Sequence, residues 1–191
     1  MTFIKDGNPF IMYNSTIPIN SRNFQKIVCF FLFECPVRTF TKKLQNDVVI
    51  ESAHSKYDYQ FHRVSNRGQS FADRGIQGAK LNSFRAAMKR VAATEIKLLA
   101  VSEIPEVIDD TCEYLIIKAN PNNVSNTEGF FYCIRNAFAH GSFNVTESKE
   151  YYFTNASRNK IKGIGRISEK TLLAWIYLFN SSLEEIKNAG K

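Results

Sequence analysis

The sequence FYCIRNAFAHG runs from Phe131 to Gly141 and changes from apolar to polar within a few residues. Read as a helix, it places Asn136 and His140 one turn apart on the same side, with Arg135 beside them. An arginine can hold phosphate oxygens through two hydrogen bonds, and a histidine can take up or release a proton near neutral pH. The stretch therefore predicts a helix over about 127–140 whose polar end suits phosphate chemistry, with Gly141 ending it in the left-handed conformation.

The same residues carry a family resemblance. Arg135 and His140 have the spacing R-x-x-x-x-H, in which Asn136 follows the arginine and Gly141 follows the histidine. The wording IRNAFAHGSF, residues 134–143, resembles the nuclease helix of the HEPN superfamily, and the resemblance extends over roughly residues 80–188. It implies a mostly α fold: a HEPN-like helical bundle with a small β-hairpin insertion near residues 150–167.

The resemblance also implies a function. HEPN ribonucleases cleave RNA without a metal or other cofactor, through attack of the ribose 2′-OH that leaves a 2′,3′-cyclic phosphate. Carried over to this chain, His140 transfers protons, Arg135 contacts the scissile phosphate and Asn136 positions it. Two motif helices meet in a homodimer, so that two His140 side chains supply both base and acid. The implied biology is a toxin or antiviral-defence effector with an antitoxin or defence-system partner. The alternative is a non-catalytic HEPN-like module that binds RNA or a protein.

The residues alone leave a purely structural interpretation open. Arg135 could pair with Glu103, Asp109 or Glu113 of the preceding acidic segment. His140 could cap the end of the helix, where a cation is favoured by the helix dipole. His54 and His62, in contrast, are interpreted as surface histidines of an irregular region.

The charge distribution favours a polyanionic partner. The net charge is +7, and basic residues gather in segments 62–90 and 156–170 whereas acidic residues gather in 103–113. Segregation of this kind suits a surface that faces RNA, although ordinary solvated faces would give the same pattern. The candidate RNA-binding residues are Arg85, Lys89, Lys160 and Lys162.

Composition excludes several other classes. The chain has 191 residues and 44% hydrophobic residues, and it shows no apolar run of the roughly 20 residues that cross a bilayer. The four cysteines form no C-x-x-C pair, which disfavours a zinc site. No Walker or dinucleotide-binding glycine loop appears. We expect a cytoplasmic protein with reduced cysteines, no metal and no membrane contact.

The chain is expected to form a single domain over residues 1–191. Its first part, 1–75, reads as irregular except for a helix from about Ser21 to Glu34, and a helical core follows over about 79–189. Further helices are expected for about twenty residues after Gly78, over 103–119 and from Ser168 onward. A short hairpin is expected from 151–153 and 160–167.

Overall fold

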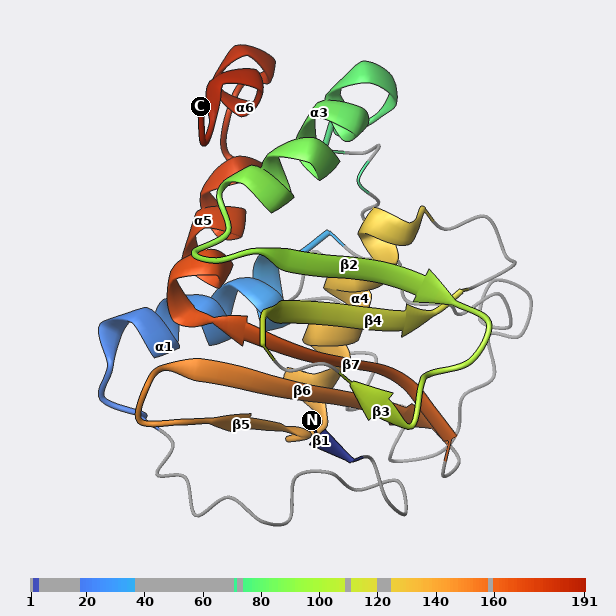
Figure 1. Cartoon of the computed structure of the whole chain (residues 1–191). Coiled ribbons are helices and arrows are strands. Elements are labelled where there is room, and N and C mark those ends of the chain that lie inside the picture. Colours follow the sequence, from blue (N-terminus) through green and yellow to red (C-terminus); the bar gives the residue numbers. More distant parts are fainter. Residues whose placement is uncertain are drawn as a thin grey trace, which may run out of the picture.

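The computed structural model describes residues 2–3, 18–36, 71, 74–108, 111–119, 125–157 and 160–191 (Figure 1). Two sheets and a set of helices make up this part of the chain. The helices are α1 (Arg22–Cys29), the π-helix η1 (Phe30–Glu34), α3 (Gly78–Arg90), α4 (Asn126–Ala139), α5 (Glu169–Phe179) and α6 (Leu183–Asn188).

A five-stranded mixed sheet lies at the centre, in the order β2-β4-β7-β6-β5. Strand β2 pairs with β4 in parallel, and every other neighbouring pair is antiparallel. A separate pair joins β1 to β3. The strands are β1 (Thr2–Phe3), β2 (Ile96–Val101), β3 (Val107–Ile108), β4 (Glu113–Lys118), β5 (Phe143–Val145), β6 (Glu150–Ser157) and β7 (Lys160–Ser168).

This architecture shows that the expected all-helical bundle is wrong. The protein is mixed α/β, and the two segments read as helix around 96–101 and over 103–119 form strands instead. The helix after Gly78 ends at Arg90, so Leu98 and Leu99 belong to β2. Short apolar runs do not distinguish a helix from a buried strand by periodicity, and β-branched and aromatic residues such as those in the segment EYLIIK favour the strand.

Other local expectations are confirmed. The helices expected from about Ser21 and from Ser168 onward are present, and each of these serines caps its helix through its side-chain oxygen. Helix α4 occupies the predicted helix of the motif. The hairpin of β6 and β7 also forms, but it is not an insertion, because β7 lies in the middle of the sheet. The last helix is interrupted around Ser181, which separates α5 from α6.

The two faces of the sheet have different environments, as the alternation along β4 shows. Leu115 and Ile117 belong to the main core that the helices cover, whereas Tyr114 and Ile116 belong to a smaller cluster with Ile108 on the other face. Such alternation is the expected consequence of the two-residue period of a strand. The helices α1, α4 and α5 therefore share one side of the sheet (Figure 1).

Helix α4 occupies the centre of that side, and Phe131 is its main anchor. The ring has no exposed surface and lies in an aromatic cluster built from distant parts of the chain. Its ring-centroid distances are 6.0 Å to Phe31, 5.5 Å to Phe71, 6.0 Å to Phe84, 5.7 Å to Trp175 and 4.8 Å to Phe179. Tilted and edge-on aromatic pairs of this kind stabilise a core beyond their buried area.

On the side of α4 that faces the sheet, glycines allow the helix and the strands to lie close together. A Cβ atom at Gly129 of α4 would lie 2.7 Å from Ile117 Cδ1, and one at Gly163 of β7 would lie 2.5 Å from Cys133 Sγ. Both distances are too short for real contacts. A side chain at either position would therefore force the facing side chain to shift, so the two glycines favour the close approach of helix and sheet.

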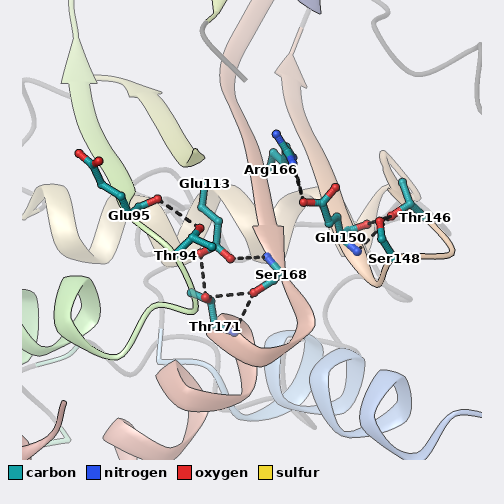
Figure 2. Close-up of polar contacts among 9 residues, drawn as sticks. All are labelled: Thr94, Glu95, Glu113, Thr146, Ser148, Glu150, Arg166, Ser168 and Thr171. Atoms are coloured by element: carbon teal, nitrogen blue, oxygen red, sulfur yellow. Dashed lines mark hydrogen bonds and ion pairs between the residues drawn. The ribbon is translucent and has the colours of Figure 1, made fainter. Parts of the chain in front are cut away.

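A buried carboxylate ties α5 to the sheet (Figure 2). Glu113 of β4 accepts hydrogen bonds from Ser168 N at 3.1 Å and from Thr171 Oγ1 at 2.7 Å. Thr171 Oγ1 in turn accepts a bond from Ala93 N at 2.8 Å. A negative charge is favoured at the N-terminus of a helix, so Glu113 stabilises the start of α5.

None of the helices described in this part of the chain is long and apolar enough to cross a membrane.

We predict that Gly163→Ala destabilises the fold by about 1–3 kcal/mol, because the added methyl group meets the sulfur of Cys133. The measurement is urea unfolding followed by the fluorescence of Trp175. The double variant with Cys133→Ala should recover part of the loss, since it removes that sulfur. Strictly additive effects of the two substitutions would contradict the proposed contact.

Candidate functional site

The candidate site lies at the C-terminal end of α4, where the chain turns sharply. His140 is the capping residue, and Gly141 follows with a φ of +65°. Gly141 N donates to Phe138 O at 3.2 Å and Ser142 N to Ala137 O at 2.8 Å, which together close the Schellman turn. The helix end is therefore held rigidly by backbone hydrogen bonds, as the glycine in the sequence predicted.

Arg135 and Asn136 are both buried, with only 7% and 8% of their surfaces exposed. Arg135 Nη1 donates a hydrogen bond of 2.6 Å to Asn136 Oδ1. A charged donor at this distance is among the stronger hydrogen bonds in proteins. The structure thus brings these two predicted residues together, but inside the protein rather than on its surface.

His140 lies in a different environment, because its side chain is exposed. Its backbone N–H donates to Asn136 O at 3.0 Å. Within the described part of the chain, no hydrogen bond or ion pair involves the imidazole. The imidazole is therefore accessible to a ligand, and it is separated by burial from the Arg135 guanidinium with which the sequence analysis grouped it.

Two further buried residues lie near Arg135, and sequence reasoning missed both. Burial raises the pKa of the Cys35 thiol, while the nearby positive charge of Arg135 lowers it and the negative charge of Glu128 raises it again. Glu128 precedes Arg135 by seven residues, so helical periodicity could have placed both on one face of α4. No local signal pointed to Cys35, which comes from the end of η1 far away in the sequence.

The structural alternative for Arg135 was a pair with one of three acidic residues. Glu113 is engaged at the start of α5 through Ser168 and Thr171, as described above (Figure 2). Glu103 is exposed, and Asp109 lies outside the described residues, as do His54 and His62.

The predicted RNA-binding residues separate into two groups. Arg85 and Lys89 are exposed on α3. Phe84 of the same helix packs against Phe131 of α4, with 6.0 Å between the ring centroids. Phe131 precedes His140 by nine residues, which corresponds to about 13 Å along the helix. The structure therefore does not bring these two cations to the helix end.

Lys160 and Lys162 are exposed at the start of β7, and they lie on the same end of the sheet as His140. Thr154 N of β6 donates to Ser142 O at 2.9 Å, two residues beyond the histidine. Lys160 pairs with a residue of β6 that is only three positions beyond Thr154, or about 10 Å along the strand. Of the four predicted RNA-binding residues, these two lysines therefore lie at the end of the sheet that is nearer to His140.

No group of three or more His, Cys, Asp or Glu side chains suited to holding a metal ion occurs among the residues that the structure describes. No protein-family model, curated protein or solved structure matches this chain. Proposals about its function therefore depend on the residues and geometry described above.

We predict opposite stability effects at the two ends of the motif. Arg135→Ala should cost about 2–3 kcal/mol in urea unfolding, because it removes a buried hydrogen bond from a charged donor and leaves Asn136 buried without it. His140→Ala should stay within about 0.5 kcal/mol of the parent protein, since exposed side chains contribute little. Equal losses in the free energy of unfolding for the two substitutions would contradict this prediction.

Proposed function

We propose that the protein is an endoribonuclease that cleaves RNA at the C-terminal end of α4, with His140 as the proton acceptor. One observation carries this proposal: an exposed imidazole at a rigid turn, next to the buried Arg135–Asn136 pair. A group for proton transfer must be accessible to substrate, as the His140 imidazole is, and the turn fixes the backbone that carries it.

The chemistry needs only groups that side chains and RNA supply. His140 takes the proton from a ribose 2′-OH, and the 2′ oxygen attacks the adjacent phosphorus. The bond to the 5′ oxygen breaks, and that oxygen takes a proton from water. The hydroxide formed takes the proton from the His140 imidazolium, and the products are a 2′,3′-cyclic phosphate and a 5′-OH end. Because the nucleophile belongs to the substrate, the protein has to contribute proton transfer, orientation and positive charge.

The positive charge is a particular requirement at this helix end. The C-terminus of a helix carries partial negative charge, which opposes the binding of an RNA phosphate. Arg135 is directed into the protein, so accessible cations have to offset this effect. We assign that role to Lys160 and Lys162, which lie at the same end of the sheet.

In this proposal Arg135 acts differently from the family expectation. Its bond to Asn136 Oδ1 fixes the orientation of the amide one turn below His140, which makes Arg135 a positioning residue rather than a phosphate ligand. The same burial favours a second candidate function, namely RNA binding without cleavage. The two candidates differ in whether purified protein produces cyclic-phosphate ends.

We predict that the purified protein cleaves single-stranded RNA in the presence of EDTA. His140→Ala should lower the cleavage rate at least about a hundredfold, because proton transfer by a positioned side chain contributes that much. The control is Lys187→Ala, an exposed residue of α6 that should cleave normally. Product ends are identified by mass spectrometry.

The result also separates the two candidates. Undiminished cleavage by His140→Ala would overturn the mechanism. RNA binding without any cleaved product in the parent protein would favour the non-catalytic function instead.

We predict that the lysines of β7 contribute more to RNA affinity than the cations of α3. The double variant Lys160→Gln with Lys162→Gln should reduce the slope of log affinity against log salt by about 1.4, since each contact to single-stranded RNA contributes about 0.7. The matched control is Arg85→Gln with Lys89→Gln, which removes the same charge elsewhere. An equal or larger loss in the control would place the RNA on α3.

A further inference from the structure

Asn155 of β6 carries a side-chain amide that no other described residue binds. The residue is only 8% exposed, and within the described part of the chain its side chain forms no hydrogen bond. Its amide atoms are not fully enclosed, so they reach solvent. Polar side chains as deeply placed as this one are nearly always hydrogen-bonded. The amide is therefore suited to a ligand that supplies the missing partner.

Asn155 lies on the side of the sheet that the helices cover. Tyr151 and Phe153 of the same strand belong to the main core, and the two-residue period of a strand puts Asn155 on their side. Across the ladder Asn155 pairs with Gly163 of β7, against which Cys133 of α4 is packed. Strand β6 is one position nearer the β5 edge than β7, and α4 contacts it as well. The amide therefore lies beneath the C-terminal part of α4 (Figure 1).

The end of α4 brings His140 to the same place. Ser142 O accepts a hydrogen bond of 2.9 Å from Thr154 N, which joins the chain after the helix to β6. His140 precedes this bond by two residues, and Asn155 follows it by one. Because β5 and β6 are antiparallel, both residues lie on the same side of the bond. His140 also follows Cys133 by seven residues, or two helical turns, so it continues the row of α4 that faces the sheet.

A bulge in β7 lies directly opposite Asn155. Asn155 pairs with Gly163 whereas Ala156 pairs with Ile161, so Lys162 is an extra residue between two paired ones. Bulges change the direction of side chains and are common beside active sites. Lys162 is exposed and is one of the two cations assigned above to the RNA phosphates. An imidazole, an amide and an ammonium group thus come from three elements to one end of the sheet.

We propose that Asn155 is a further catalytic residue of this site, whose Nδ2 donates a hydrogen bond to a non-bridging oxygen of the scissile phosphate. The inference rests on the proposed RNA cleavage, and it gives Asn155 the phosphate contact that the family resemblance implied for buried Arg135. Negative charge grows on the non-bridging oxygens as the 2′ oxygen attacks, and a positioned amide donor stabilises that charge. The amide breaks no bond to a described residue when it turns toward the phosphate.

The variant Asn155→Ala tests this role through the rate of cleavage. It should lower kcat about a hundredfold, since the loss of one positioned donor costs that much. It should leave KM within about threefold of the parent value, because the contact strengthens only as charge develops in the transition state. The matched control is Asn82→Ala, at an exposed asparagine of α3, which should cleave normally. Undiminished kcat in Asn155→Ala would overturn the proposal.

A sulfur substitution in the substrate tests whether the contact is direct, with circular dichroism and Trp175 fluorescence as checks that each variant is folded. Sulfur is a weak hydrogen-bond acceptor. The parent protein should therefore cleave more slowly when sulfur replaces one of the two non-bridging oxygens of the scissile phosphate. Asn155→Ala should lose this difference between the two diastereomers. The same difference in the parent and in Asn155→Ala would show that Asn155 does not touch the phosphate, and would overturn the proposal.

A binding measurement separates failure of this inference from failure of the proposed function. RNA with a 2′-O-methyl group at every nucleotide cannot be cleaved, because its nucleophile is blocked. Asn155→Asp should bind this RNA at least about tenfold more weakly than the parent, since a carboxylate repels the phosphate. Asn82→Asp, which makes the same change of charge on α3, should bind it as the parent does.

The outcomes are distinct. A parent protein that binds this RNA but cleaves no unmodified RNA would overturn the proposed function and the catalytic role, whereas weaker binding by Asn155→Asp would still support the phosphate contact. Equal binding by the parent and Asn155→Asp would overturn the contact itself. A parent protein that binds no RNA would overturn both proposals.

Discussion

The packing of α4 between an aromatic cluster and the central sheet is the constraint on which the rest of this structure depends. On one side Phe131 joins rings from η1, α3, α5 and the single described residue Phe71. On the other side glycines in α4 and β7 bring the helix into direct contact with the strands. Because the helix is enclosed on both sides, the position of its C-terminal turn relative to the sheet is determined by core packing.

This enclosure explains why Arg135 and Asn136 of the motif are buried whereas His140 is exposed. A helix with a solvated face would expose the polar residues on that face, but α4 buries Glu128, Arg135 and Asn136 as well as its apolar residues. His140 escapes burial only because the helix ends there and the chain reverses at Gly141. Of the three motif residues His140 is therefore the exposed one, whereas Arg135 and Asn136 are joined to each other by a buried hydrogen bond.

The two edges of the sheet have different surroundings. The β5 edge follows the turn that carries His140, and the same end of the sheet carries the exposed lysines of β7. The β2 edge is apolar and pairs with β4 alone among the described strands.

The sequence by itself determined the local features whose causes are local. Ser21 and Ser168 act as helix caps, Gly141 ends α4, and the hairpin of β6 and β7 forms, because each depends on residues within a few positions. The identity of α4 as a helix followed from its length and pattern. The tertiary structure alone decided that the segments around Leu98 and Leu115 are strands, since an apolar run can pack as either element until a partner is present. It also decided that Arg135 is buried and His140 exposed, because burial depends on distant elements such as η1, which adjoins α4 only in the folded protein.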